Sequence, residues 1–268
     1  MRTVSLSLLL PLASMALFAA AALPAAAAVK TEVVEYKDGD QLCEGFLAYD
    51  DAAKGKRPGV VVVHDWMGIS DETRRRTKML AELGYVALAA DVYGKGIRPK
   101  DAKEAGALAG KYKGDLPLLR SRVRAAFDTL SKNPRVEASK VFAIGYCFGG
   151  TTALELARSG APLAGVVSFH GGLSTKDPAD AKNVKCPVLA LHGAADPYVP
   201  PAEVAAFQKE MTDAKVDWQM VYYADAVHAF TNPGAGNDPS KGAAYDARAD
   251  RRSWEAMKAF FAERLKAK

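Results

Sequence analysis

The sequence predicts an α/β fold, in which a mostly parallel sheet is covered by helices on both faces. Apolar segments of strand length alternate with segments of helical pattern along most of the chain. Residues 59–63, Gly-Val-Val-Val-Val, form the unbroken β-branched run of a strand buried on both faces. Residues 141–150 lead from another apolar run through a glycine-rich turn into a helical pattern. The length of 268 residues suits one large domain, which we place at residues 29–268.

Residues 1–28 have the pattern of a secretory signal peptide. Arg2 supplies a positive charge, residues 4–18 form a short apolar core, and residues 20–28 end in small residues of the A-x-A type. A transmembrane anchor is the alternative, but the apolar core is short and no basic cluster follows it. We therefore expect cleavage near Ala28, export to the periplasm or the exterior, and no stable membrane anchor.

The composition is that of a soluble globular protein, with 49% hydrophobic and 25% charged residues. The net charge is +5, and the lysines and arginines are dispersed along the chain. We therefore predict neither a nucleic acid nor a membrane surface as a partner.

Three cysteines follow the signal pattern: Cys43, Cys147 and Cys186. An odd number of cysteines in an exported protein leaves at least one thiol free. Cys43 falls early in a predicted edge strand, and Cys186 precedes a late strand. We do not expect these two places to meet, which disfavours a disulfide between them, but the sequence does not decide whether this pair is bridged.

The first part of the domain reads as a hairpin followed by a strand and a helix. Residues 31–36 and 41–49 flank an Asp-Gly turn signal. The valine-rich strand then leads to a helix that Ser70 or Asp71 caps and that Gly84 ends. We expect the basic side chains of this helix to face solvent: Arg74, Arg75, Arg76 and Lys78.

The remaining elements continue the alternation of strands and helices. A buried strand at residues 85–90 is followed by a loop at 91–99 and helices at 102–112 and 116–131. After the glycine-rich turn, we predict strands at 165–169, 187–191 and 218–223, a helix at 203–211, and a closing helix at 245–266. No internal repeat or linker interrupts this order.

The Gly145-Tyr146-Cys147-Phe148-Gly149 segment has the pattern of a nucleophile elbow, with cysteine where serine is commoner. A nucleophile on so tight a turn sits in strained backbone, so the residues two before and two after it must be small. The turn lifts the Cys147 side chain above the sheet and directs the Phe148 N–H toward any oxyanion formed there. The alternative is a buried, inert cysteine at the end of a strand.

Candidate partners of Cys147 favour the nucleophile. Asp196 and His228 follow it in the order nucleophile, acid, histidine that this arrangement uses. All three residues fall at carboxyl ends of predicted strands, where open α/β sheets bind their ligands. We therefore predict His228 as the general base and Asp196 as the group that orients its ring.

The other histidines and one further carboxylate are weaker candidates. His64 and His192 lie directly at strand ends, where we expect them to brace loops by hydrogen bonds. We expect His170 to line the pocket, but because it precedes Asp196 in the chain it does not fit the order of a catalytic base. Asp225 lies in the same loop as His228, which leaves Asp196 better placed to orient the ring.

Three motifs resemble the dienelactone hydrolases, over about residues 31–261. They are Gly-Tyr-Cys-Phe-Gly-Gly at 145–150, His-Gly with Asp-Pro-Tyr-Val-Pro at 192–200, and Ala-Val-His-Ala-Phe at 226–230. The resemblance implies an α/β-hydrolase fold and a Cys-His-Asp triad that opens esters or lactones through a thioester acyl-enzyme. From the resemblance we expect the enzyme to use no metal and no organic cofactor. We expect the Trp66 and Phe148 N–H groups to form the oxyanion hole.

The sequence departs from the family at positions near the thiol and the substrate. Asp65 stands where well-studied members carry a Glu beside the thiol, so we expect Asp65 to modulate the thiol. The alternative is that Asp65 only braces the loop that presents the Trp66 N–H. Lys95, with Arg98 nearby, and Asn232 stand where those members use two Arg to hold a substrate carboxylate. We take as tentative substrate contacts Tyr93, Lys95, Arg98, His170 and Asn232.

These observations predict an exported cysteine hydrolase acting on small esters, lactones or thioesters. The charges of Lys95 and Arg98 predict a modest preference for anionic esters, unless they are solvated loop charges. Two alternatives from other classes stay open: a binding protein that has kept the scaffold without catalysis, and a redox-active thiol protein that uses Cys147.

Overall fold

The computed structural model describes residues 28–266. Its strands are β1 (Val29–Asp38), β2 (Gln41–Asp50), β3 (Arg57–Val63), β4 (Val86–Ala90), β5 (Val136–Tyr146), β6 (Gly165–Phe169), β7 (Val188–Gly193) and β8 (Trp218–Tyr223). Its α-helices are α1 (Asp71–Glu82), α2 (Ala102–Gly114), α3 (Leu116–Ser131), α4 (Phe148–Arg158), α5 (Pro201–Asp213) and α6 (Ala247–Lys266). The 3₁₀ helices are η1 (Pro178–Asn183), η2 (Pro233–Ala235) and η3 (Pro239–Lys241). The predicted signal peptide, apart from its last residue, lies outside the described residues.

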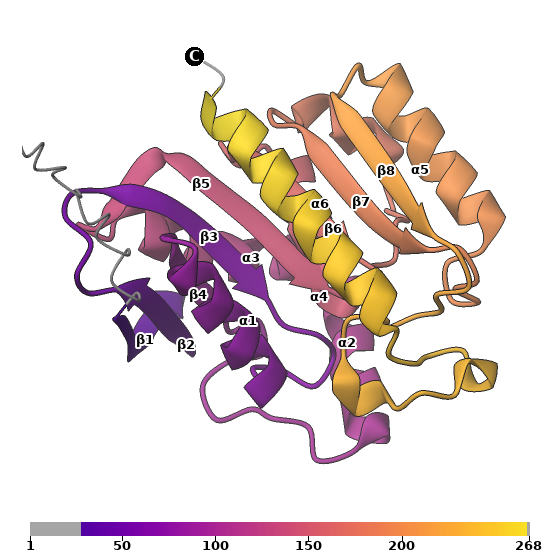
Figure 1. Cartoon of the computed structure of the whole chain (residues 1–268), viewed down its shortest axis with the longest axis horizontal. Coiled ribbons are helices and arrows are strands. Elements are labelled where there is room, and N and C mark those ends of the chain that lie inside the picture. The colour runs from indigo at the N-terminus through magenta and orange to yellow at the C-terminus, as the bar shows by residue number, and fades with distance from the viewer. Residues whose placement is uncertain (1–27, 267–268) are drawn as a thin grey trace, which may run out of the picture.

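All eight strands join one sheet in the order β1-β2-β4-β3-β5-β6-β7-β8 (Figure 1). Strand β2 pairs antiparallel with β1 and β4, and every pair from β4 through β8 is parallel. The mostly parallel α/β sheet that the sequence predicts is therefore confirmed. Because consecutive parallel strands run in one direction, the loops that follow them gather at one edge.

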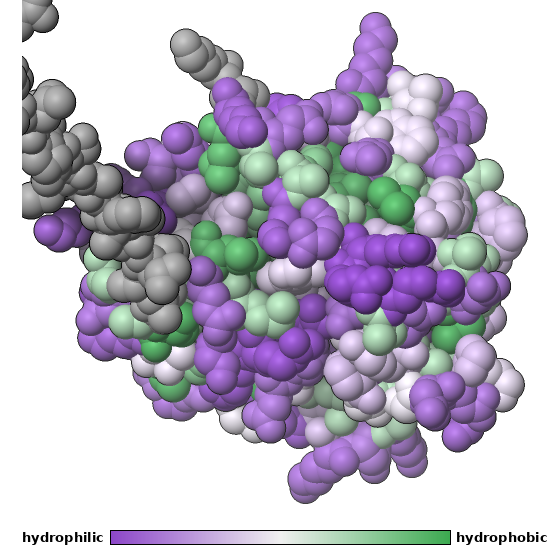
Figure 2. Space-filling model, viewed as in Figure 1, coloured by the Kyte–Doolittle hydropathy of each residue, from purple (hydrophilic) through white to green (hydrophobic). Residues whose placement is uncertain are grey.

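The central strands are buried on both faces, as their unbroken apolar sequences predict. In β3, Val60 and Val62 pack into a core shared with α1 and α6, whereas Val61 and Val63 pack into a second core shared with α2 to α5. Helix α6 crosses the front of the sheet in Figure 1. Hydrophilic residues predominate on the face shown in Figure 2, and hydrophobic ones form small, scattered patches there.

Two local expectations are wrong. Strand β2, which carries Cys43, is an interior strand because β1 covers its outer side. Arg76, expected on the solvent face of α1, is 2% exposed. Its guanidinium pairs with Glu72 at 2.8 Å and Asp250 at 2.7 Å, and it donates to the Thr231 carbonyl at 2.6 Å. These partners make burial of the charge possible.

Within residues 28–266, none of the helices has the length and apolar character that crossing a membrane requires.

Candidate active site

Cys147 lies on the turn between β5 and α4, in a conformation that few residues adopt, with φ 54° and ψ −116°. A Cβ atom on Gly145 would lie 1.9 Å from the Gly149 carbonyl oxygen. One on Gly149 would lie 2.3 Å from the Val63 carbonyl oxygen. Because both obstacles are backbone atoms, only glycine fits at either position. The structure therefore contains the tight strand–turn–helix connection that the sequence predicts.

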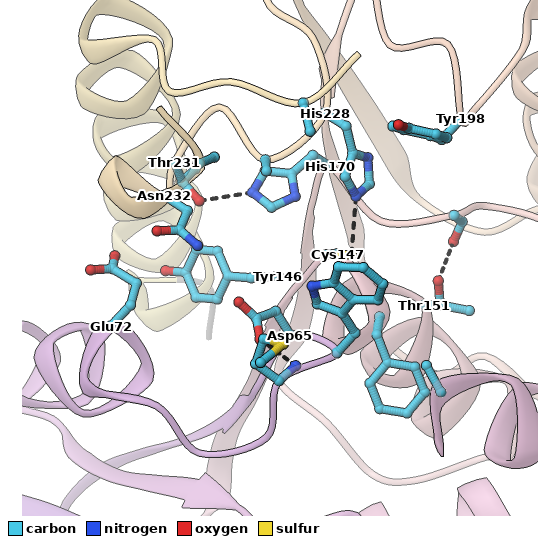
Figure 3. Close-up of a pocket in the computed structure, with 18 of the residues that line it drawn as sticks. Asp65, Glu72, Tyr146, Cys147, Thr151, His170, Tyr198, His228, Thr231 and Asn232 are labelled. Carbon is cyan, nitrogen blue, oxygen red and sulfur yellow. Dashed lines mark hydrogen bonds between the residues drawn. The ribbon is translucent and has the colours of Figure 1, made fainter. Parts of the chain in front are cut away.

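Cys147, His228 and Asp196 form one chain of contacts beyond the ends of β5, β8 and β7. The His228 Nε2 atom lies 3.0 Å from Cys147 Sγ (Figure 3). The His228 Nδ1 atom lies 2.8 Å from Asp196 Oδ2. The other Asp196 oxygen accepts a hydrogen bond from the Tyr198 N–H at 2.8 Å, which fixes the buried carboxylate. The three residues that the sequence singles out are therefore side by side.

The surroundings of His228 favour its charged form. Burial disfavours the charge, but the hydrogen bonds to Asp196 and Cys147 outweigh burial and raise the pKa of His228 from 6.5 to about 10. A protonated ring beside the sulfur stabilises a thiolate at Cys147. The arrangement can therefore supply an activated sulfur nucleophile and a proton donor next to each other.

His170 lies against the ring of His228, with the two ring centroids 5.3 Å apart (Figure 3). Its Nε2 atom is 2.8 Å from Thr231 Oγ1. Burial and the nearby charge of His228 hold the pKa of His170 well below 6.5. His170 is therefore a neutral neighbour of the triad-like chain.

The remaining histidines and Asp225 lie apart from the thiol. The His64 ring contacts the Asp65 carbonyl at 2.6 Å and accepts from the Val92 N–H at 3.3 Å, so it braces two loops as expected. Burial lowers the pKa of His64 to about 4. His192 is buried edge-on against Tyr222, with no hydrogen bond to its ring among the described residues. The Asp225 side chain is 88% exposed and faces Arg248.

Phe148 and Trp66, whose peptide N–H groups the sequence predicts as an oxyanion hole, both line the cavity that contains Cys147. Phe148 is the first residue of α4, and the start of this helix packs against the carbonyl groups of Val63 and His64. The Tyr93 hydroxyl donates to the Trp66 carbonyl at 2.9 Å, a contact that restrains the peptide group following Trp66. Within residues 28–266, neither N–H donates to another protein group, so both are available to a ligand.

Asp65 lines the same cavity as Cys147, but its carboxylate is hydrogen-bonded to its own loop. Its Oδ1 atom accepts a hydrogen bond from the Met67 N–H at 2.8 Å. Burial raises the pKa of Asp65, the Met67 N–H opposes this, and the charge of Glu72 adds to it. Among the described residues Asp65 makes no hydrogen bond to the thiol. The carboxylate therefore braces the loop that presents Trp66.

A cavity of about 720 Å³ contains the Cys147–His228 pair. Its wall comes from helices α1 and α2, from the turn and start of α4, and from the loops after β3, β6, β7 and β8. The residues that contribute are Asp65, Trp66, Met67, Glu72, Thr73, Arg76, Gly106, Ala109, Gly110, Lys113, Tyr146, Cys147, Phe148, Thr151, His170, Gly172, Tyr198, Val199, His228, Ala229, Thr231, Asn232, Gly234, Ala235 and Ala243.

The tentative substrate contacts divide into two groups. His170 and Asn232 line the cavity, whereas Tyr93, Lys95 and Arg98 do not. The Lys95 ammonium pairs with Glu35 and, at 3.7 Å, with Glu44 on the hairpin.

Arg98 donates to the Ile97 carbonyl at 2.7 Å and lies 3.3 Å from Asp91. The Tyr93 side chain is fully buried. The preference for anionic esters predicted from Lys95 and Arg98 therefore has no support from their positions.

Sequence analysis did not place Glu72, Arg76 and the α2 residues in the cavity wall. The cavity positions of helix α2 are three small residues, Gly106, Ala109 and Gly110, followed by Lys113. Arg76 reads as a surface residue because the partner that neutralises it, Asp250, lies 174 residues later in the chain. Only the three-dimensional packing places these residues near the thiol.

Cys43, Cys147 and Cys186 are free thiols in the structure. Among residues 28–266, no group of three His, Cys, Asp or Glu side chains is arranged to hold a metal ion.

Comparison with known proteins identifies relatives over nearly the whole domain. A dienelactone hydrolase-like promiscuous phosphotriesterase from metagenomic libraries is 45% identical, with a TM-score of 0.84 over 88% of this chain and 98% of its own. A solved structure described as m3DLH is 43% identical, with a TM-score of 0.85 over the same shares. The "Putative carboxymethylenebutenolidase" of Salmonella typhimurium is 29% identical over 204 residues, 72% of this chain and 74% of its own.

These likenesses show an α/β-hydrolase fold and a dienelactone hydrolase-like hydrolase. Residues 43–265 match the Dienelactone hydrolase family. With that match across most of its length, this chain belongs to the dienelactone hydrolase family.

Proposed function

We propose that this hydrolase cleaves small carboxylic esters, lactones or thioesters through a Cys147–His228–Asp196 triad. The observation that carries the proposal is the chain of short contacts from sulfur to imidazole to carboxylate, 3.0 Å and 2.8 Å long. The strained turn beneath Cys147 and the cavity above it support the same role.

In this mechanism the Cys147 sulfur attacks the substrate carbonyl carbon, and the carbonyl electron pair moves onto oxygen. The N–H groups of Phe148 and Trp66 stabilise that oxyanion. As the intermediate collapses, protonated His228 gives its proton to the departing alkoxide and a thioester remains on Cys147. The now neutral His228 takes a proton from water, which attacks the thioester. The carboxylic acid leaves, and the thiolate and imidazolium return.

An ester panel with purified protein tests this proposal. We expect hydrolysis of 4-nitrophenyl and lactone substrates, with loss of at least about 10³-fold in kcat for Cys147→Ala. We also expect Asp196→Asn to lower kcat, because the amide cannot orient and charge the His228 ring as the carboxylate does. Asp225→Asn is its matched control, because Asp225 lies in the same loop as His228 without touching the ring. Unchanged hydrolysis by Cys147→Ala would falsify the assignment of the nucleophile.

The same panel should include a phosphotriester with the same leaving group. The 45% identical relative is described as a promiscuous phosphotriesterase, and N–H groups that stabilise a carbonyl oxyanion can also stabilise negative charge on a phosphoryl oxygen. We expect carboxylic esters to be the better substrates.

The two alternatives from other classes predict different behaviour of the thiol. A binding protein would show no dependence of Cys147 alkylation on His228, and a redox protein would cycle between thiol and disulfide. The contact of Cys147 with a histidine that is itself held by a carboxylate favours hydrolysis over both.

We also propose that the protein is exported and that residues 1–28 are removed. The charged start, the short apolar core and the small residues before Val29 support this. Expression of the full chain in a Gram-negative host, followed by intact mass measurement of the periplasmic protein, tests it. A full-length mass confined to the cytoplasm would contradict export.

A further inference from the structure

Helix α2 has two interior glycines, Gly106 and Gly110, that the helix itself does not require. Neither residue has a positive φ, and a Cβ atom on either would meet no other atom within 4 Å. In a helix interior only proline is less favourable than glycine. Neither the backbone conformation nor close packing against another element therefore explains these two residues.

Both glycines line the cavity that contains Cys147 and His228. Gly106, Ala109, Gly110 and Lys113 all line it, and their spacing of i, i+3, i+4 and i+7 puts them on one face of the helix. Between residues 106 and 110 this face presents nothing larger than a methyl group to the cavity. The space in front of it is therefore left open for a ligand.

Other walls of the cavity also indicate a ligand with an apolar part. Trp66 and Tyr198 line the cavity and are 39% and 60% exposed, so their rings offer aromatic surface against which an apolar group can pack. Tyr146 lines the cavity too, and its buried hydroxyl has no hydrogen-bond partner among residues 28–266, which indicates a polar atom of the ligand beside the apolar part. Buried hydroxyls usually have a hydrogen-bond partner.

We propose that the α2 face formed by Gly106, Ala109 and Gly110 is the subsite for a bulky apolar group of the substrate, and that the two glycines set its size. The substrate class is then an ester with a branched or aromatic group, rather than a short acetate. This inference rests on the proposed hydrolysis at Cys147.

The test compares Gly106→Leu and Gly110→Leu with wild type on two series of esters. One series varies the acyl group from acetyl to branched and aromatic acids with one leaving group, and the other varies the alcohol of an acetate. We expect kcat/KM for the bulky members of one series to fall by about tenfold or more. The value for the smallest ester should change by less than about twofold. The series that responds shows which side of the ester lies on α2.

Ala107→Leu is the matched control, since Ala107 is an exposed residue of α2 outside the cavity wall. It should leave both series unchanged. Gly106→Ala and Gly110→Ala add only one methyl group and should raise the Tm. They should lower kcat/KM for the bulky esters less than the leucine variants do. They keep the test decisive if a leucine variant fails to fold.

Equal losses on small and bulky esters, or unchanged activity on the bulky ones, would overturn the α2 subsite. A wild-type protein that hydrolyses no ester of either series would instead overturn the proposed function, so the two failures are distinguishable.

Discussion

His228 holds its proton because of two neighbours on opposite sides of its ring. The Asp196 carboxylate and the Cys147 sulfur together overcome the effect of burial and raise the pKa of His228 to about 10. The folded-state value lies above the ordinary 6.5, so the ring stays charged through neutral pH and loses its proton only as the pH approaches about 10.

Asp196→Asn should therefore slow the alkylation of Cys147 by iodoacetamide. The amide offers no charge to the ring, the pKa of His228 falls, and near neutral pH the imidazolium no longer stabilises the thiolate. We expect the rate to fall by about tenfold, which corresponds to about 1.4 kcal/mol. Rates are measured against pH, with Asp225→Asn as the control. Coincident profiles for wild type and Asp196→Asn would contradict this account.

Asp65 is a second carboxylate near the thiol, and we propose that it opposes the thiolate only weakly. Its contact with the Met67 N–H directs it to the loop, and it is one methylene shorter than the Glu of well-studied family members. We expect Asp65→Glu to slow alkylation of Cys147 near neutral pH and Asp65→Asn to speed it slightly. Three superimposable profiles would confine the role of Asp65 to the loop.

Among single residues, the sequence predicts the triad, because its members are recognised by their order along the chain. It does not predict which way a loop side chain points, and so it places Lys95 wrongly. Cys147, Asp196 and His228 follow strand ends that the topology brings together. Lys95 also follows a strand end, but the acidic side chains of Glu35 and Glu44 draw its ammonium away from the cavity. Nothing in the local sequence shows which charge it will meet.

Among the elements, the turn between β5 and α4 tolerates least change. We expect Gly145→Ala to destabilise the protein by about 3 kcal/mol or more, because the new methyl group would overlap a backbone carbonyl that cannot rotate away. Urea unfolding measures the loss. Gly110→Ala is the control, since its methyl group meets nothing, and it should stabilise α2 by up to about 1 kcal/mol. Equal effects of the two substitutions would argue against a steric requirement at the elbow.

Most element positions could be predicted because each leaves a local signal. The valine run of β3, the Asp-Gly turn between β1 and β2, and the Ser70 cap of α1 are all read from a few adjacent residues. The wall that α2 contributes to the cavity could not be predicted in this way. Its small residues are compatible with any helix, and only packing shows that their open side faces Cys147.

Over the whole molecule, Arg76 connects parts of the chain that are remote in sequence. It joins α1 to α6 through Asp250 and to the loop after His228 through the Thr231 carbonyl. We expect Arg76→Met to cost about 3–5 kcal/mol, because it leaves a buried carboxylate and a carbonyl without their partner. Arg75→Met removes a more exposed pair with Glu72 and should cost about 0–1 kcal/mol. Similar urea midpoints for the two variants would contradict this role of Arg76.

Because two of the three cysteines are buried, titration of the reactive thiol can count the active sites of this protein. Burial raises the pKa of Cys43 to about 11 and that of Cys186 to about 12, and both side chains are at most 4% exposed. Cys147, beside a charged imidazole in an open cavity, is the thiol that reagents can reach. Titration of the native protein with a chromogenic disulfide should therefore release one equivalent quickly and give the concentration of competent active sites. The other two equivalents should appear at the rate of global unfolding, so the same trace also reports kinetic stability.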